Sequence, residues 1–135
     1  MITRIVMGVA AALFAAACAG SNPTTPSSTN SPTTVTWSGS VAAGGQSTRS
    51  FTVSRAGDVT LSLNSVNLGA DRAIGVGIGL ADGAGCHLSA TGRGSSTALP
   101  SVTAAVDEGT YCASIFDAGG IGDGTVGFSL TLTYP

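Results

Sequence analysis

The sequence predicts an all-β protein, an antiparallel β-sandwich of about seven or eight strands with a jelly-roll-like arrangement. Three observations predict it. Beyond residue 34, apolar residues recur at every second position, which is the spacing of half-buried strands. Glycine is abundant, with 20 residues in 135, and Gly, Asp and Ser separate the alternating segments as turn residues. No stretch in this region has the 3.6-residue spacing of an amphipathic helix.

The first segment, residues 1–17, reads as a signal peptide. Met1 to Arg4 is short and ends in a positive charge, and Ile5 to Ala17 is a run of thirteen apolar or small residues. A membrane-spanning helix needs about 20 such residues. The apolar core of a signal peptide runs to about 7–15, so this length predicts export.

Cys18 follows three alanines, Ala15 to Ala17, directly at the end of that run. The stretch resembles the bacterial lipoprotein signal, in which the cysteine becomes the first residue of the mature protein and carries diacylglycerol. The resemblance implies lipidation at Cys18, a membrane as partner through the N-terminal lipid, and, with Ala19 next, an outer-membrane location in the cell envelope. The same alanines also fit the A-x-A cleavage site of an ordinary secretory leader, which would give a secreted protein.

Residues 18–34 are predicted to form the lipidated cysteine and a disordered linker. Residues 19–34, "AGSNPTTPSSTNSPTT", have no charge, no large apolar side chain and three of the five prolines. Such a tract cannot bury enough apolar surface to offset its conformational entropy. Sixteen residues in polyproline form would reach about 50 Å, which suits a tether between a lipid surface and a folded domain.

Residues 35–135 are predicted to form the sandwich domain, which is long enough to bury a core of its own. Its alternating segments are 35–41, 50–54, 58–65, 73–81, 110–116 and 125–134. In the fourth segment Gly75, Gly77 and Gly79 form the face opposite the apolar one. A glycine face can admit a ligand or a neighbouring backbone, or it can be covered by bulky side chains of an adjacent strand or mark a bend.

Cys86 and Cys112 are expected to form a disulfide, because both belong to an exported domain. The bond would join the "GAGCHL" turn, residues 83–88, to the penultimate strand, and would contribute roughly 3.5 kcal/mol by loop entropy. Pairing these two leaves Cys18 for the lipid.

The charge balance disfavours nucleic acid and anionic membrane surfaces as partners. There is no lysine, and without Arg4 four arginines oppose seven acidic residues, a formal charge of −3. Nucleic-acid binding needs clustered cations, which the sequence does not show.

The stretches "RSFTVSRAGDVTLSL" (49–63), "IGLADGAG" (78–85), "VDEGTYCASIFD" (106–117) and "GFSLTLTY" (127–134) together resemble the bacterial pre-peptidase C-terminal domain family. The resemblance implies a small secreted β-sandwich. In that family the module usually follows a secreted peptidase, and relatives bind collagen or polysaccharide. No peptidase precedes the domain in this sequence, so a helper role would concern a separately encoded hydrolase.

The sequence predicts no catalytic residues and no enzyme. The only histidine, His87, lies beside Cys86, and such a pair can supply a nucleophile or metal ligands. A disulfide would consume the thiolate, which leaves His87 as an exposed turn residue. No G-x-S-x-G elbow or phosphate-binding glycine loop before a helix is present.

No cofactor is expected, and calcium is the one candidate. Asp82, Asp117 and Asp123 lie in glycine-rich turns that can supply oxygen ligands, although Asp and Gly are also the ordinary residues of β-turns. Calcium-binding relatives in the resembling family use acids before the first strand, and this chain has none before Asp58. The sequence therefore favours a non-catalytic, lipid-anchored envelope protein that binds an extracellular protein or polysaccharide. The alternative is an accessory domain of a separate secreted hydrolase.

Overall fold

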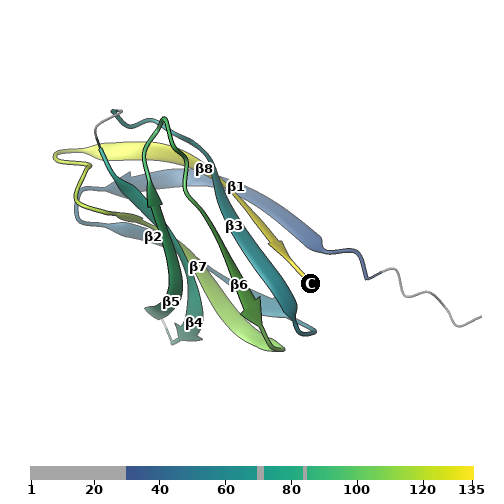
Figure 1. Ribbon diagram of the computed structural model, residues 1–135. Coiled ribbons are helices and arrows are strands. Elements are labelled where there is room, and N and C mark those ends of the chain that lie inside the picture. The colour runs from purple at the N-terminus through teal and green to yellow at the C-terminus, as the bar shows by residue number, and fades with distance from the viewer. Residues whose placement is uncertain (1–29, 70–71, 84) are drawn as a thin grey trace, which may run out of the picture.

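The computed structural model describes residues 30–69, 72–83 and 85–135, which form eight strands in two four-stranded antiparallel sheets (Figure 1). The strands are β1 (Thr33–Ala42), β2 (Gln46–Val53), β3 (Gly57–Val66), β4 (Ile74–Asp82), β5 (Gly85–Gly94), β6 (Ser101–Val106), β7 (Gly109–Asp117) and β8 (Thr125–Tyr134). The described residues contain no helix, and therefore no helix that could span a membrane. The predicted β-sandwich is confirmed.

The strand order is that of a jelly roll. One sheet has the order β1-β8-β3-β6 and the other β2-β7-β4-β5. The pairings are nested along the chain, since β4 pairs with β5, β3 with β6, β2 with β7 and β1 with β8. The chain is thus one long antiparallel hairpin rolled into two sheets.

The nesting divides the connections between two ends of the sandwich. Where β1 begins, Thr33 pairs with Tyr134 at the end of β8, and the β2–β3, β4–β5 and β6–β7 connections lie at this same end, here called the tail end. The opposite end, here called the loop end, carries the β1–β2, β3–β4, β5–β6 and β7–β8 connections. Figure 1 shows the C-terminus and the β7–β8 connection at opposite ends.

The core lies between the sheets and is built from the alternating apolar positions that the sequence shows. Its buried members are Val41, Phe51, Val53, Val59, Leu61, Leu63, Ile74, Val76, Ile78, Ala113, Ile115, Ile121, Val126, Phe128, Leu130 and Leu132. Along the side where β1 lies beside β2, the Arg49 guanidinium sits 5.7 Å from the centroid of the half-buried Trp37 ring. This cation–π contact covers the edge of the core.

Three details differ from the sequence prediction. The first strand begins at Thr33, inside the predicted linker of residues 18–34. β5 and β6 are strands that the segment-by-segment analysis did not identify, and β5 contains Cys86 and His87, which were assigned to a turn. In both strands the inward positions hold valine or small residues that are only half buried, so the apolar alternation is shallow.

Candidate functional site

β5 bends over the outer face of its own sheet and is joined there to β7. In the sheet β4 lies between β5 and β7, so two strand spacings of about 4.8 Å would separate them. The predicted Cys86–Cys112 disulfide is formed nevertheless, with a Cα–Cα distance of 5.8 Å. The register shifts between Ile78 and Gly79, which leaves Ser89 as an extra residue in β5. Such a bulge bends a strand, and here it lets β5 reach across β4.

The glycine face of β4 is covered rather than open. A Cβ atom at Gly75 would lie 2.3 Å from the ring of Phe116. At Gly77 it would lie 2.9 Å from the Leu88 side chain, and at Gly79 only 1.9 Å from the carbonyl oxygen of His87. The sequence left open whether a ligand, a neighbouring backbone, bulky side chains or a bend accounts for this face. The structure shows side chains of the adjacent strands over the glycines and a bend in β5 beside them. The space beside these glycines is filled by the protein's own atoms rather than left open to a ligand.

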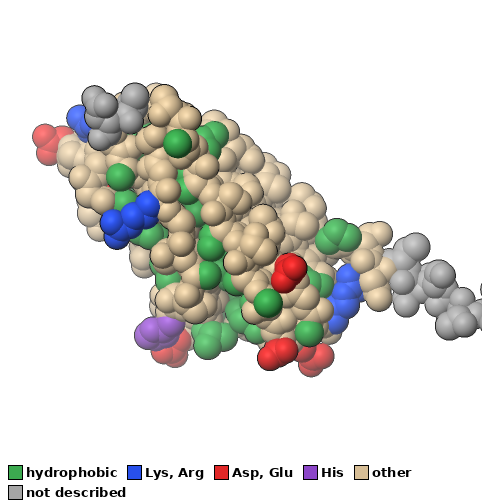
Figure 2. Space-filling model, viewed as in Figure 1, with side chains coloured by type: hydrophobic (Ala, Val, Ile, Leu, Met, Phe, Trp, Pro, Cys, Tyr) green, Lys and Arg blue, Asp and Glu red, His purple; other side chains and the backbone are tan. Residues whose placement is uncertain are grey.

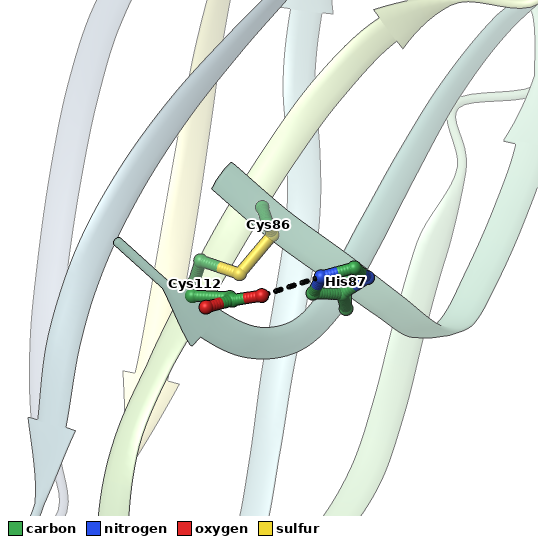
Figure 3. Close-up of polar contacts among 4 residues, drawn as sticks. Cys86, His87 and Cys112 are labelled. Carbon is green, nitrogen blue, oxygen red and sulfur yellow. Dashed lines mark hydrogen bonds and ion pairs between the residues drawn. A yellow bond between two sulfur atoms is a disulfide. The ribbon is translucent and has the colours of Figure 1, made fainter. Parts of the chain in front are cut away.

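His87 lies next to the disulfide and contacts Asp82. Its Nε2 atom is 2.9 Å from Oδ2 of Asp82, and the two side chains are 73% and 71% exposed (Figure 3). The neighbouring Cys86 sulfur is bonded to Cys112, so it is not available as a nucleophile. His87 is therefore one half of an exposed pair at the tip of the β4–β5 hairpin, on a strand rather than on the predicted turn.

Asp117 organises the loop end. Its Oδ2 atom accepts a hydrogen bond from the Gly44 amide at 2.7 Å, and Oδ1 accepts from the amides of Gly119, Gly120 and Ile121 at 2.9, 2.8 and 3.1 Å. These donors, the Gly44 amide first, lower the pKa of the carboxyl from 3.8 to about 2, since they stabilise its charged form. One carboxylate thus joins the β1–β2 turn to the β7–β8 connection.

The three aspartates considered for calcium are not brought to one place. Asp117 pairs with Ile74 at the start of β4, whereas Asp82 ends that strand, roughly 26 Å away at 3.3 Å per residue. Within the described ranges no group of three or more His, Cys, Asp or Glu side chains is placed to hold a metal ion. The Asp117 oxygens are bonded to backbone amides, and Asp123 lies in the exposed part of the β7–β8 connection.

The outer face of the β1-β8-β3-β6 sheet is lined with hydroxyl groups that bond one another across the strands. The side-chain pairs are Thr34 with Thr133 (3.3 Å), Thr36 with Thr131 (3.1 Å), Thr60 with Thr103 (3.0 Å) and Ser62 with Ser101 (2.9 Å). In Figure 2 charged side chains lie toward the ends of the visible face, and the area between them is mostly uncharged. The hydroxyls satisfy each other, which is a usual way for a solvated sheet face to be stabilised.

A pocket of about 260 Å³ opens at the tail end. It lies between the β2–β3 and β6–β7 connections and is lined by Ala56, Gly57, Asp58, Ala105, Val106 and Asp107. Tyr111 supports this region by donating a hydrogen bond from its hydroxyl to the Asp107 carbonyl, at 2.9 Å. The lining contains two carboxylates, those of Asp58 and Asp107, and no serine, cysteine, histidine or cation.

The sequence did not predict that Asp117 joins the β1–β2 turn to the β7–β8 connection through hydrogen bonds to four backbone amides. The available signal was an aspartate at the end of a strand followed by "AGGIGDG", a stretch whose backbone amides can fold back onto a carboxylate. The Gly44 donor comes from 73 residues away, so no local pattern indicates it. Arg72, which donates to the Ile121 carbonyl, was likewise not identified.

No family model matches the chain, and no curated protein matches it in sequence. Among solved structures, the chain is similar to PliG of Aeromonas hydrophila, a periplasmic lysozyme inhibitor of g-type lysozyme. The identity is 16% and the TM-score 0.51, over 77% of this chain and 87% of PliG. At this identity the two proteins share a fold, and the similarity spans most of both chains.

Proposed function

We propose that this protein is a non-catalytic, lipid-anchored protein of the bacterial cell envelope that binds another protein, and that its partner is a lysozyme-type hydrolase of the cell wall. The observation that carries the proposal is the fold similarity to PliG, a periplasmic inhibitor, over 77% of the chain. Fold alone does not determine function, so the surface must supply the specificity.

The two cysteines of the domain, Asp117 and His87 are engaged in contacts within the protein, which is in keeping with a binding role. Cys86 and Cys112 are bonded to each other, and Asp117 is held by four backbone amides. His87 contacts Asp82 at an exposed hairpin tip, where its ring is 73% exposed.

The anchor is the second part of the proposal. Cys18 and the tract that follows it, up to residue 29, lie outside the described residues, so lipidation and the outer-membrane location rest on the sequence alone. The resemblance to the pre-peptidase C-terminal domain family likewise remains a prediction. An anchored inhibitor would meet a hydrolase in the compartment where the cell wall is degraded. Because β1 begins at Thr33, the tether has 14 residues, 19–32, and would reach about 43 Å from the lipid surface in polyproline form.

The test is hydrolysis of purified peptidoglycan by a g-type lysozyme, with and without the full-length protein in detergent. We expect slower hydrolysis together with binding of the lysozyme in a calorimetric titration. Binding that accelerates hydrolysis would favour the accessory role instead. Binding to peptidoglycan without any binding to lysozyme would contradict a protein partner and favour a polysaccharide ligand.

A further inference from the structure

β1 lies at one edge of its sheet, and its second edge has no partner among the strands that the structure describes. In the order β1-β8-β3-β6 it pairs only with β8, over its full length from Thr33 to Ala42 and without a register shift. Figure 1 shows it running beside β8 along the sandwich. An edge of this kind presents a row of unpaired N–H and C=O groups to another chain.

The other three edge strands carry features that hinder pairing with another chain. β2 contains Arg49, and β5 contains Arg93 and the extra residue at its register shift. β6 has only 6 residues and follows Pro100. In contrast, β1 has the sequence "TTVTWSGSVA", with no charge, no proline and no bulge. Charged side chains, prolines, bulges and short strands are the usual protection of sheet edges, so β1 is the edge left open to a second chain.

The register with β8 shows which residues of β1 face this open edge. The Ala43 amide donates a hydrogen bond to the Gly124 carbonyl at 3.1 Å, and this pair continues the β1–β8 register. Hydrogen-bonded pairs recur at every second residue of an antiparallel ladder, so the odd-numbered residues of β1 bond to β8. The exposed residues that direct their N–H and C=O groups to the open edge are therefore Thr34, Thr36, Ser38 and Ser40.

This edge is complementary to a second copy of itself. With a two-fold axis at Trp37, Thr36 lies opposite Ser38 of the second copy, and Thr34 lies opposite Ser40 of the second copy. The four pairs give about eight main-chain hydrogen bonds, and a typical protein–protein interface has about ten. Every facing side chain carries a hydroxyl, and β1 already pairs hydroxyl with hydroxyl across to β8 on the same face.

Trp37 adds an apolar contact at the axis. Its side chain is half buried on the inner face, beside the Arg49 guanidinium at 5.7 Å. In the two-fold arrangement it lies opposite Trp37 of the second copy in a non-hydrogen-bonded pair, where facing side chains come closest. Aromatic pairs at such positions stabilise neighbouring strands.

We propose that two copies of the protein associate through β1, antiparallel and centred on Trp37, and form one continuous sheet from the two β1-β8-β3-β6 sheets. A second copy fits the edge better than an extended peptide of another protein, because every position that faces the edge matches its counterpart in the same strand. The two-fold pairing also occupies both β1 edges, so the assembly closes at two copies. This association goes beyond the proposed binding of a hydrolase and does not depend on it.

The test is sedimentation equilibrium of the full-length protein in density-matched detergent, over a dilution series, with two proline variants. Ser38→Pro removes an outward N–H and places a ring on the open edge, and edge strands tolerate proline where the N–H bonds nothing in the sheet. Ala105→Pro is the matched control: the hydrogen bond from the Leu63 amide to the Pro100 carbonyl sets residue 105 toward the free edge of β6. We expect a dimer whose Kd rises at least about tenfold with Ser38→Pro and less than about twofold with Ala105→Pro.

Two measurements on the parent test the register without any variant. Raising the protein concentration should slow amide hydrogen exchange at Thr34, Thr36, Ser38 and Ser40 and leave exchange in β6 unchanged. Dilution should shift the fluorescence emission of Trp37, the only tryptophan, to longer wavelength as the copies separate.

A protein that stays monomeric up to about 1 mM would overturn the association. A dimer that survives Ser38→Pro, or concentration-dependent protection on another edge strand, would overturn its assignment to β1. If Ser38→Pro does not fold, Ser38→Lys keeps the N–H group and adds a charge to the edge, so it should still weaken the dimer. Loss of lysozyme binding with the dimer intact would overturn the proposed function and leave the association standing.

Discussion

At the residue scale, Asp117 shows how one side chain can organise elements far apart in the sequence. The carboxylate satisfies four amides that would otherwise lack a partner at the loop end, one of them from Gly44. Hydrogen bonds to a charged acceptor are stronger than neutral ones. Since all four donors favour the ionised carboxylate, the energy of this arrangement depends on pH.

Asp117 should make folding stability fall in acid. Its pKa is about 2 in the folded protein against 3.8 as the ordinary value, so the folded state favours the deprotonated form. The stabilisation is complete above about pH 4 and is lost as the pH falls toward 2. Urea unfolding between pH 2 and 6 should show this loss in the parent and a weaker one in Asp117→Asn.

Asp123→Asn is the matched control for that measurement. It removes a carboxyl from the same connection, but one that accepts none of these hydrogen bonds, so the acid loss of stability should remain as in the parent. The same pH dependence in the parent and in Asp117→Asn would show that other groups govern the acid transition.

At the scale of elements, the strands that the sequence predicts are those with a deep apolar face. Segments such as Thr125–Tyr134 place Val126, Phe128, Leu130 and Leu132 inward, all buried, and their period of two is plain. β5 was missed because its inward positions are Ala90, Gly92 and Gly94, which carry little apolar signal, whereas Cys86 and Leu88 face the outer side of the sheet. β6 is short and begins directly after Pro100.

The covering of the glycine face was beyond sequence reasoning for a different reason. It depends on β5 crossing β4, which brings the His87 backbone against Gly79 and Leu88 against Gly77. Spacing within β4 indicates that something approaches the glycines closely, but not which element does so. The disulfide pairing, in contrast, followed from the cysteine count and the predicted export alone.

The disulfide should be the main support of β5 in its bent position. It closes a loop with a sequence separation of 26, for which the entropic model gives roughly 3.5 kcal/mol of stability. Replacement of both cysteines, Cys86→Ala with Cys112→Ala, should therefore lower the free energy of unfolding by about that amount, measured by urea denaturation. Hydrogen exchange in β5 should rise more than in β8, since β8 lies in the middle of the other sheet.

Reducing agent provides the control for the same bond. It should destabilise the parent to a similar extent and have no effect on the double variant. If the parent and the double variant unfold at the same urea concentration, the bent strand is held by the contacts of Leu88 and the His87 backbone with Gly77 and Gly79 rather than by the disulfide.

At the scale of the whole molecule, the jelly roll places the proposed anchor and the β7–β8 connection at opposite ends of the sandwich. β1 begins at the tail end, so the sandwich starts there, opposite the β7–β8 connection. If Cys18 carries lipid, the tail end is the one joined to the membrane by the tether, and the loop end is free to face outward. The net charge is consistent with a domain held away from the membrane surface. The full chain has a formal charge of −2, so anionic lipid headgroups do not attract it.

Lipidation at Cys18 can be tested by measuring the mass of the mature protein and its location in the host cell. We expect a chain that begins at Cys18, carries acyl chains and lacks two hydrogens because Cys86 and Cys112 are bonded. More than one acyl chain gives stable membrane binding, where a single chain is marginal, so this species should sediment with membranes. Cys18→Ser should abolish the lipid and leave the membrane fraction without mature protein, whereas Ser21→Ala, in the same tract, should behave as the parent. An unmodified mature chain released into the soluble fraction would instead identify residues 1–17 as an ordinary secretory leader, with its cleavage site in the alanines at 15–17.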